Sequence, residues 1–175
     1  MNRSFARIAH GIDRINAVAG RLASWCCLLV IAIEFAVVVM RYVFGVGSIA
    51  AQESVLYAAS ALFMLAAAWT LQIDGHVRID IFYQPATPRA RATIDLVGSL
   101  VFLLPFAFVL AFESLPYVEH SWAILERSRE ASGLPFTYLL KTLIPLFAIL
   151  LGLQGIANII RALLVLIGPP VQAPR

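Results

Sequence analysis

Charged residues are scarce in this sequence of 175 residues, and long polar stretches are missing. Only 13% of the residues are charged, 61% are hydrophobic, and the mean hydropathy is +0.88. Soluble domains are about 25% charged and roughly 45–50% apolar. The longest polar stretches, 72–92 and 113–135, are far shorter than the roughly 50 residues of a small domain. The composition therefore predicts an integral membrane protein without a separate soluble catalytic domain.

Residues for several kinds of reaction centre are also missing from the apolar stretches. His10, His76 and His120 lie outside them, which argues against a haem held by paired histidines. No apolar stretch combines a serine with a histidine, or two aspartates, as intramembrane proteolysis would need. The adjacent Cys26 and Cys27 suit neither an ordinary disulfide nor a metal site. We therefore expect no enzyme activity, no cofactor and no bound metal.

Four apolar stretches are long enough to cross a membrane, which takes about 20 residues for a hydrocarbon core of about 30 Å. They are 22–44, 54–71, 93–112 and 137–160. Pro105 and Pro145 lie inside two of them and predict kinks. The predicted fold is an all-α membrane protein of four transmembrane helices, with one domain over 1–175 and a tail at 161–175.

The segment 1–21 has the pattern of an amphipathic helix. Its apolar residues are separated by steps of three and four, so they share one helical stripe that excludes Arg7, Arg14 and Arg21. The stripe consists of Phe5, Ile8, Ile12, Ile15, Ala19 and Leu22. We predict an interfacial helix that lies along the membrane surface before the chain turns inward. A mobile polar tail is the alternative, whereas a cleaved signal peptide is disfavoured because 22–44 is longer than a usual signal core.

The distribution of basic residues predicts the orientation of the helices. One side carries nine, namely Arg3, Arg7, Arg14, Arg21, Arg78, Arg89, Arg91, Arg161 and Arg175. The other side carries four, namely Arg41, Arg127, Arg129 and Lys141. Because cytoplasmic loops are enriched in Lys and Arg, we expect both termini in the cytoplasm of a bacterial cell and the protein in its inner membrane. These residues are topology signals and not a nucleic-acid patch.

A few charged residues lie within or beside the predicted helices. Glu34 falls inside the first, where a charge costs about 2.5–3.5 kcal/mol. It either handles a proton or cation, or it forms a hydrogen bond that fixes packing against a neighbouring helix or subunit. Arg41 and Glu53 lie at similar depth on either side of a short loop, so we predict that they form an ion pair. For the same reason we predict a pair between Glu113 and Lys141.

The segment between the second and third helices alternates polar and apolar residues. Asp74, His76, Arg78 and Asp80 are followed by the aromatic Phe82 and Tyr83. This pattern indicates an interfacial segment with a small charge network. The acids and the histidine also allow a metal site to be drawn, but their number makes that alternative weak.

Four motifs in order resemble those of the small permease subunit of tripartite ATP-independent periplasmic (TRAP) transporters. They are Arg41-Tyr42-Val43-Phe44, Glu53 at the start of the second helix, Gly75-His76-Val77-Arg78-Ile79-Asp80, and Gly133-Leu134-Pro135 followed by Pro145. The tryptophans often found before the second-helix glutamate and near the fourth helix are absent. The resemblance covers the whole chain. Together with the charged residues at membrane depth, Glu34 and Lys141, its motifs give the candidates for structural or partner-interface roles, namely Glu34, Arg41, Glu53, His76, Arg78, Asp80, Pro135 and Lys141.

The resemblance implies a subunit that braces a large permease within the lipid bilayer. The large subunit would carry an organic acid or similar solute together with an ion, and a periplasmic binding protein would deliver that solute. Two alternatives remain open: a self-sufficient small multidrug-type exporter that uses Glu34, and a membrane assembly subunit with no transport role. A gene for a large permease next to the gene of this protein would favour the TRAP small subunit over both alternatives.

Overall fold

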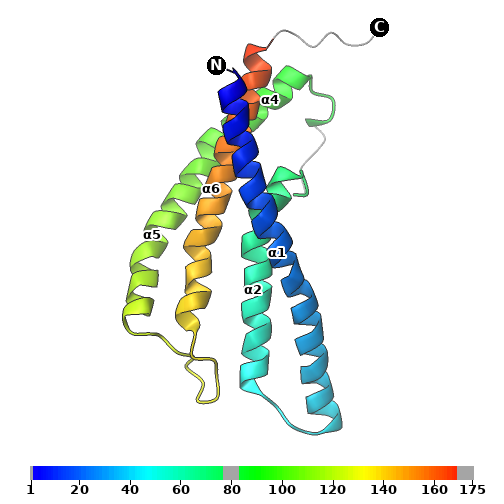
Figure 1. Ribbon diagram of the computed structural model, residues 1–175, viewed down its shortest axis with the longest axis vertical. Helices are drawn as coiled ribbons and strands as arrows, with labels where there is room; N and C mark the ends of the chain where they lie inside the picture. Colours follow the sequence, from blue (N-terminus) through cyan, green and yellow to red (C-terminus); the bar gives the residue numbers. More distant parts are fainter. Residues whose placement is uncertain (1, 77–82, 169–175) are drawn as a thin grey trace.

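The computed structural model describes residues 2–76 and 83–168, and its regular elements there are all helical (Figure 1). They are α1 (Asn2–Val43), α2 (Ile49–Gln72), α4 (Pro88–Val97), η1 (Gly98–Leu103), α5 (Leu104–Ala123) and α6 (Thr137–Ile167). The segments α4, η1 and α5 follow one another directly and form one long helical run. Four helical segments are long and apolar enough to span a membrane, so the predicted four-helix fold is confirmed.

The helices are longer than the apolar stretches that predict them. At 1.5 Å per residue, the 42 residues of α1 extend about 63 Å, roughly twice the thickness of a hydrocarbon core. The 24 residues of α2 extend only about 36 Å. An apolar stretch predicts only the part of a helix that can lie in the hydrocarbon core. The helix itself can continue beyond that part, as α1 does through the arginine-rich N-terminal segment.

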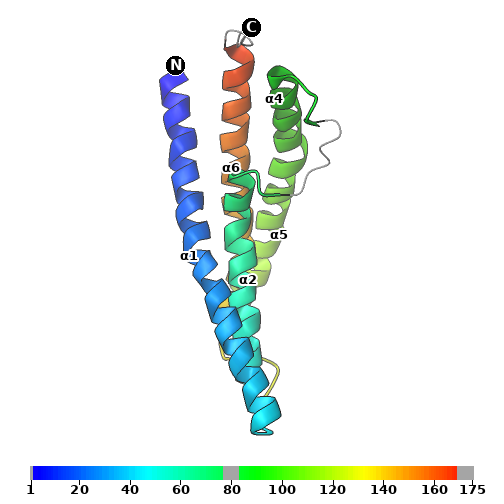
Figure 2. The same ribbon diagram turned by 90° about the vertical axis from the view of Figure 1, so that its right-hand side faces the viewer.

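The N-terminal segment differs from its prediction. It does not turn before the first predicted span, because α1 is a single helix from Asn2 to Val43 (Figure 2). Most of the predicted apolar stripe is not covered by the rest of the chain, since Phe5, Ile8 and Ile15 are exposed. The buried positions between residues 9 and 23 are Ala9, Ile12, Asn16, Ala17, Gly20 and Ala23, and Ile12 alone among them belongs to the stripe. Location of this segment at the membrane surface remains a prediction.

Helix α6 is the centre of the bundle because it contacts α1, α2, α4, η1 and α5. A third of its most apolar stretch is buried, compared with 6% in α1 and in α2. Near the termini, Ala9 and Ile12 of α1 pack with Ala157 of α6. At the opposite end, α2 and α6 are separated in Figure 1, and the connection 124–136 passes between them.

Small residues permit the close approach of α1 and α2. A Cβ atom added to Gly20 would lie under 3.0 Å from the side chain of Trp69. The glycine therefore lets the indole of α2 contact the α1 backbone directly. Ser48 begins α2 as its N-cap, since its hydroxyl accepts a hydrogen bond from the Ala51 amide at 3.3 Å.

One predicted kink coincides with a change of helix type. The π-helical segment η1 ends two residues before Pro105. Proline lacks an amide hydrogen, and its ring clashes with the carbonyl four residues earlier. A wider π turn relieves that clash, and the Leu104 amide accordingly donates to the Ser99 carbonyl. Pro145 lies inside α6, which continues without a break to Ile167.

Candidate functional site

A polar cluster joins α1 to α6 near the two termini. Arg161 donates through Nη1 to both carboxylate oxygens of Asp13, at 2.8 and 2.7 Å, and through Nη2 to Asn158 Oδ1 at 2.7 Å. The Asp13 side chain is 16% exposed and that of Arg161 is 40% exposed. Hydrogen bonds between charged groups are roughly twice as strong as neutral ones. This pair therefore holds together two helices that are far apart in the sequence.

Two amide side chains extend the cluster into the interior. Asn16 and Gln154 are fully buried, and Asn16 Nδ2 donates to Gln154 Oε1 at 2.7 Å. Gln154 Nε2 in turn donates to Asn158 Oδ1 at 3.3 Å and to Asp13 Oδ1 at 3.4 Å. We refer to Asp13, Asn16, Gln154, Asn158 and Arg161 as the terminal cluster. Such interhelical bonds stabilise membrane bundles, in which lipid is as apolar as the helices themselves.

At the other end of the molecule, Glu53 binds the connection between α5 and α6. Its Oε2 accepts a hydrogen bond from the Leu134 amide at 2.6 Å, and its Oε1 accepts one from the Ser128 hydroxyl. The Ser128 amide donates to the Leu134 carbonyl at 3.1 Å, which closes this part of the loop. A Cβ atom on Gly133 would lie under 3.0 Å from both Ser128 and Glu53. We refer to Glu53, Ser128, Gly133 and Leu134 as the loop clamp.

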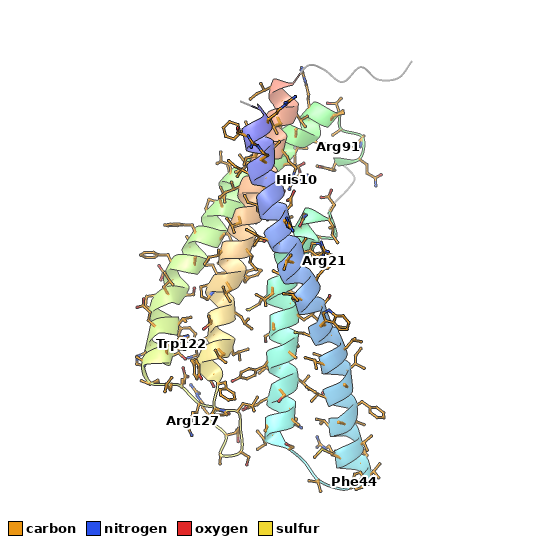
Figure 3. All side chains as sticks on the ribbon, viewed as in Figure 1. His10, Arg21, Phe44, Arg91, Trp122 and Arg127 are labelled. Carbon is orange, nitrogen blue, oxygen red and sulfur yellow. The ribbon has the colours of Figure 1, made fainter. Side chains whose placement is uncertain are left out.

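Lys141 pairs with the same loop from the start of α6. Its ammonium lies 2.5 Å from Glu126 Oε2 and 3.9 Å from the centre of the Tyr117 ring. The hydrogen bond from Lys141 lowers the pKa of Glu126 below its usual range. Nearby, Trp122 Nε1 donates to Thr142 Oγ1 at 2.9 Å, at the loop end of α5 (Figure 3). The Lys141–Glu126 pair thus fastens the loop to α6, and the contacts of Tyr117 and Trp122 fasten α5 to α6.

Both predicted ion pairs are wrong. Glu53 does not pair with Arg41, because its two carboxylate oxygens are directed to the Ser128 hydroxyl and the Leu134 amide. Lys141 pairs with Glu126 and not with Glu113, which is exposed on α5. In each case a loop residue supplies the partner that the prediction sought in a neighbouring helix. Pro135 follows Leu134 directly and is half-buried between the loop clamp and α6.

Only part of the predicted charge network after α2 can be described. The ring atom Nε2 of His76 lies 3.3 Å from the Ala67 carbonyl, which joins the segment to the end of α2. Arg78 and Asp80 lie outside the described residues. Within the part of the chain that the structure describes, no cluster of three or more His, Cys, Asp or Glu side chains is arranged to hold a metal ion.

An open cavity of about 760 Å³ lies where α2, α4, η1 and α6 meet. Its polar lining residues include Gln72, Asp95, Arg91 and Arg161. Asp95 accepts a hydrogen bond from the Tyr83 hydroxyl at 2.8 Å, and Arg161 belongs to the terminal cluster. Arg91 donates to the carbonyl of Ala86, five residues earlier. Asp95, Arg91 and Arg161 are thus engaged in bonds that hold neighbouring segments in place, whereas Gln72 Oε1 is buried and accepts no hydrogen bond from the described residues.

The charged groups brought together include several that the sequence analysis did not single out. The terminal cluster was missed because Arg161 was interpreted only as a topology signal. The sequence nevertheless contains a pattern that indicates the terminal cluster. Gln154, Asn158 and Arg161 are spaced by four and three residues, so they share one face of a largely apolar helix. Asp13 and Asn16 show the same three-residue spacing on α1. Matched polar faces on two apolar helices indicate an interhelical contact.

These features define a small polytopic membrane protein whose polar residues hold helices and a loop together. Residues 30–165 match the family described as tripartite ATP-independent periplasmic transporters, DctQ component. Because the match covers most of the chain, the protein belongs to this family and is the small permease subunit of a TRAP transporter. The match begins after the N-terminal segment that carries Asp13 and Asn16. No curated protein and no solved structure matches the chain.

Proposed function

We propose that this chain braces the large permease subunit of its transporter during ion-coupled uptake of an organic acid or similar small solute. A periplasmic binding protein delivers the solute, and the large subunit carries it. The observation that supports a bracing role is the use of polar groups at the two ends of α6. The terminal cluster and the loop clamp fix helix to helix and helix to loop. Bonds of this kind suit a part of the complex that keeps its shape.

The proposed location is the bacterial inner membrane, with both termini in the cytoplasm. The nine-to-four distribution of basic residues supports this orientation. The loop that contains Glu126 and Ser128 then faces the periplasm, and the terminal cluster lies toward the cytoplasm. Along α1, Arg21 and Arg41 are 20 residues apart, or about 30 Å, which fits the thickness of a hydrocarbon core.

A self-sufficient exporter is the main competing function. Such a protein needs its titrating acid in a space shared by its own helices, where a substrate can reach it. Glu34 is exposed on the outer surface of α1. This position favours contact with another molecule over a role in transport through the chain itself.

Reconstitution into proteoliposomes tests the proposed function. We expect the purified chain alone to show neither uptake nor efflux across a panel of carboxylic acids. Addition of the large permease encoded beside it, together with the binding protein, should produce uptake that requires an ion gradient. Proton-driven transport by the chain alone, abolished by Glu34→Gln, would overturn the proposal and favour the exporter.

A further inference from the structure

Glu34 is the one charged residue of α1 between Arg21 and Arg41. Seven residues separate it from Arg41, so it lies about 10 Å inside the end of the span that Arg41 marks. A carboxylate exposed to hydrocarbon at such a depth costs about 2.5–3.5 kcal/mol. The same 10 Å prevents Glu34 and Arg41 from pairing with each other. A partner that pairs with Glu34 would offset this cost.

That partner is not supplied by the described part of the chain. Glu34 is exposed and forms no ion pair with residues 2–76 or 83–168. Its neighbours at helical spacing are also uncovered, since Ile31 is 59% exposed and Val38 is 43% exposed. Cys27 and Arg41 are exposed on the same side of the helix. We refer to Cys27, Ile31, Glu34, Val38 and Arg41 as the Glu34 face.

The Glu34 face is separate from the side of α1 that packs on α2. Half-buried side chains on α1 recur at Val30, Ile33, Val37 and Met40 with steps of three and four. Their centre lies roughly 90° around the helix from Glu34, at about 100° per residue. The packing of the α1–α2 hairpin therefore leaves the Glu34 face available to another chain.

We infer that the Glu34 face binds a transmembrane helix of the large permease, and that a basic side chain of that helix pairs with Glu34. The inference rests on the proposed function and adds the chemistry of the contact. Charge complementarity selects the occupant, because a buried carboxylate is stabilised by a cationic partner. A second copy of this chain fits poorly. Copies inserted in the same direction would place one Glu34 opposite the other at equal depth, and like charges repel.

Charge reversal with a matched control tests this contact. The chain and the large permease are produced together, and the permease that co-purifies with each variant is quantified. We expect Glu34→Lys to lower it at least tenfold, because two cations would meet at the contact. Ala36 is exposed, lies about 3 Å further along α1 and points about 160° away from Glu34. Ala36→Lys places the same charge at a similar depth on another side of the helix and should change the yield less than threefold.

Three further measurements separate loss of contact from loss of folding. Glu34→Gln keeps the shape and an acceptor oxygen but loses the charge, so it should lower co-purification less than Glu34→Lys does. The loss caused by Glu34→Lys should be reversed by a basic-to-acidic substitution selected in a transmembrane helix of the permease. A benzophenone side chain at position 31 or 38 should cross-link to the permease, and one at position 36 should not.

Three results would overturn the inference. They are normal co-purification of Glu34→Lys, an equal loss with Ala36→Lys, or cross-links from positions 31 and 38 that reach only a second copy of this chain. Failure of the wild-type chain to co-purify with the permease is a different result. It would contradict the proposed function before any variant is compared.

Discussion

The two ends of α6 are both held by charged residues, but different parts of the molecule supply the partners. At the terminal end, Arg161 binds the side chain of Asp13 on another helix. At the loop end, Glu53 binds a backbone amide and a hydroxyl of the loop, and Lys141 binds a loop carboxylate. The first arrangement fixes the distance between helices, whereas the second fixes the path of a connection. The terminal cluster should therefore govern global stability, and the loop clamp should govern local order.

The largest expected effect is an all-or-none difference between the two ends of the molecule in the labelling of a single cysteine from outside the membrane. In a background with Cys26 and Cys27 replaced by alanine, a single cysteine is placed at Ala131 or at Ala86. A membrane-impermeant maleimide added to intact spheroplasts should label Ala131→Cys and should not label Ala86→Cys, because the basic residues predict that the two ends lie on opposite sides. Labelling of Ala86→Cys without Ala131→Cys would reverse the orientation.

Loss of the ion pair at the terminal end should cause the largest change in stability. Arg161→Ala leaves Asp13 in a largely buried site without its cation. Breaking a buried pair costs about 3–5 kcal/mol, and because Arg161 is 40% exposed we expect roughly 2–3 kcal/mol here. Unfolding in detergent micelles, followed by circular dichroism, measures this change.

Two controls accompany the Arg161 variant. Arg14 is exposed on the same N-terminal segment, so Arg14→Ala should leave the free energy of unfolding nearly unchanged. In a double-mutant cycle, Asp13→Ala and Arg161→Ala should together cost less than the sum of the two single changes. Strict additivity would show that the pair contributes nothing to stability.

At the loop end, Glu53→Ala should have a smaller global effect and a larger local one. The half-buried carboxylate accepts two bonds, and their loss should cost about 1–2 kcal/mol. The main result should be faster proteolytic cleavage within 124–136, because the Leu134 amide and the Ser128 hydroxyl lose their acceptor. Gln52→Ala changes the adjacent exposed residue and should not alter cleavage.

A second change in the loop clamp removes no charge. Because a Cβ atom on Gly133 would collide with Ser128 and Glu53, Gly133→Ala should accelerate cleavage to a similar extent as Glu53→Ala. If cleavage in both variants matched the wild-type rate, the loop would be held by other contacts, such as the Lys141 pair.

Much of the fold could be predicted from the sequence because hydrocarbon imposes a length and a composition on each span. The four helices, the position of Glu53 at the start of α2 and the Gly133-Leu134-Pro135 segment before α6 follow from that constraint and from the family motifs. The partners of Glu53 and Lys141 did not follow. They depend on the path of the loop, which the sequence does not specify.

The apolar stripe of the N-terminal segment does not identify the face that packs on the bundle, and there is a physical reason. Apolar periodicity identifies the packing face of a helix that would otherwise meet water. Where lipid or a partner chain covers the surface, an apolar side chain gains little by turning inward, and small residues mark the packing face instead. Ala9, Ala17 and Gly20 accordingly face the bundle, while Ile8 and Ile15 point away from it.

The smallest expected effect is a pH dependence of the free energy of unfolding that arises from Glu126 at the loop end. The hydrogen bond from Lys141 lowers the pKa of Glu126 in the folded protein. Because the folded state favours the ionised carboxylate, this stabilisation is complete above the ordinary pKa of about 4.5 and is lost as the pH falls through the lower folded value. The wild type should therefore lose stability relative to Glu126→Gln below about pH 4.5.

This difference is measured by unfolding both proteins at a series of pH values between 3 and 7, in steps of ~0.5 pH unit. Glu130 is exposed in the same loop, so Glu130→Gln should follow the wild type at each pH. A constant difference between wild type and Glu126→Gln over this range would mean that the 2.5 Å contact with Lys141 does not stabilise the folded state.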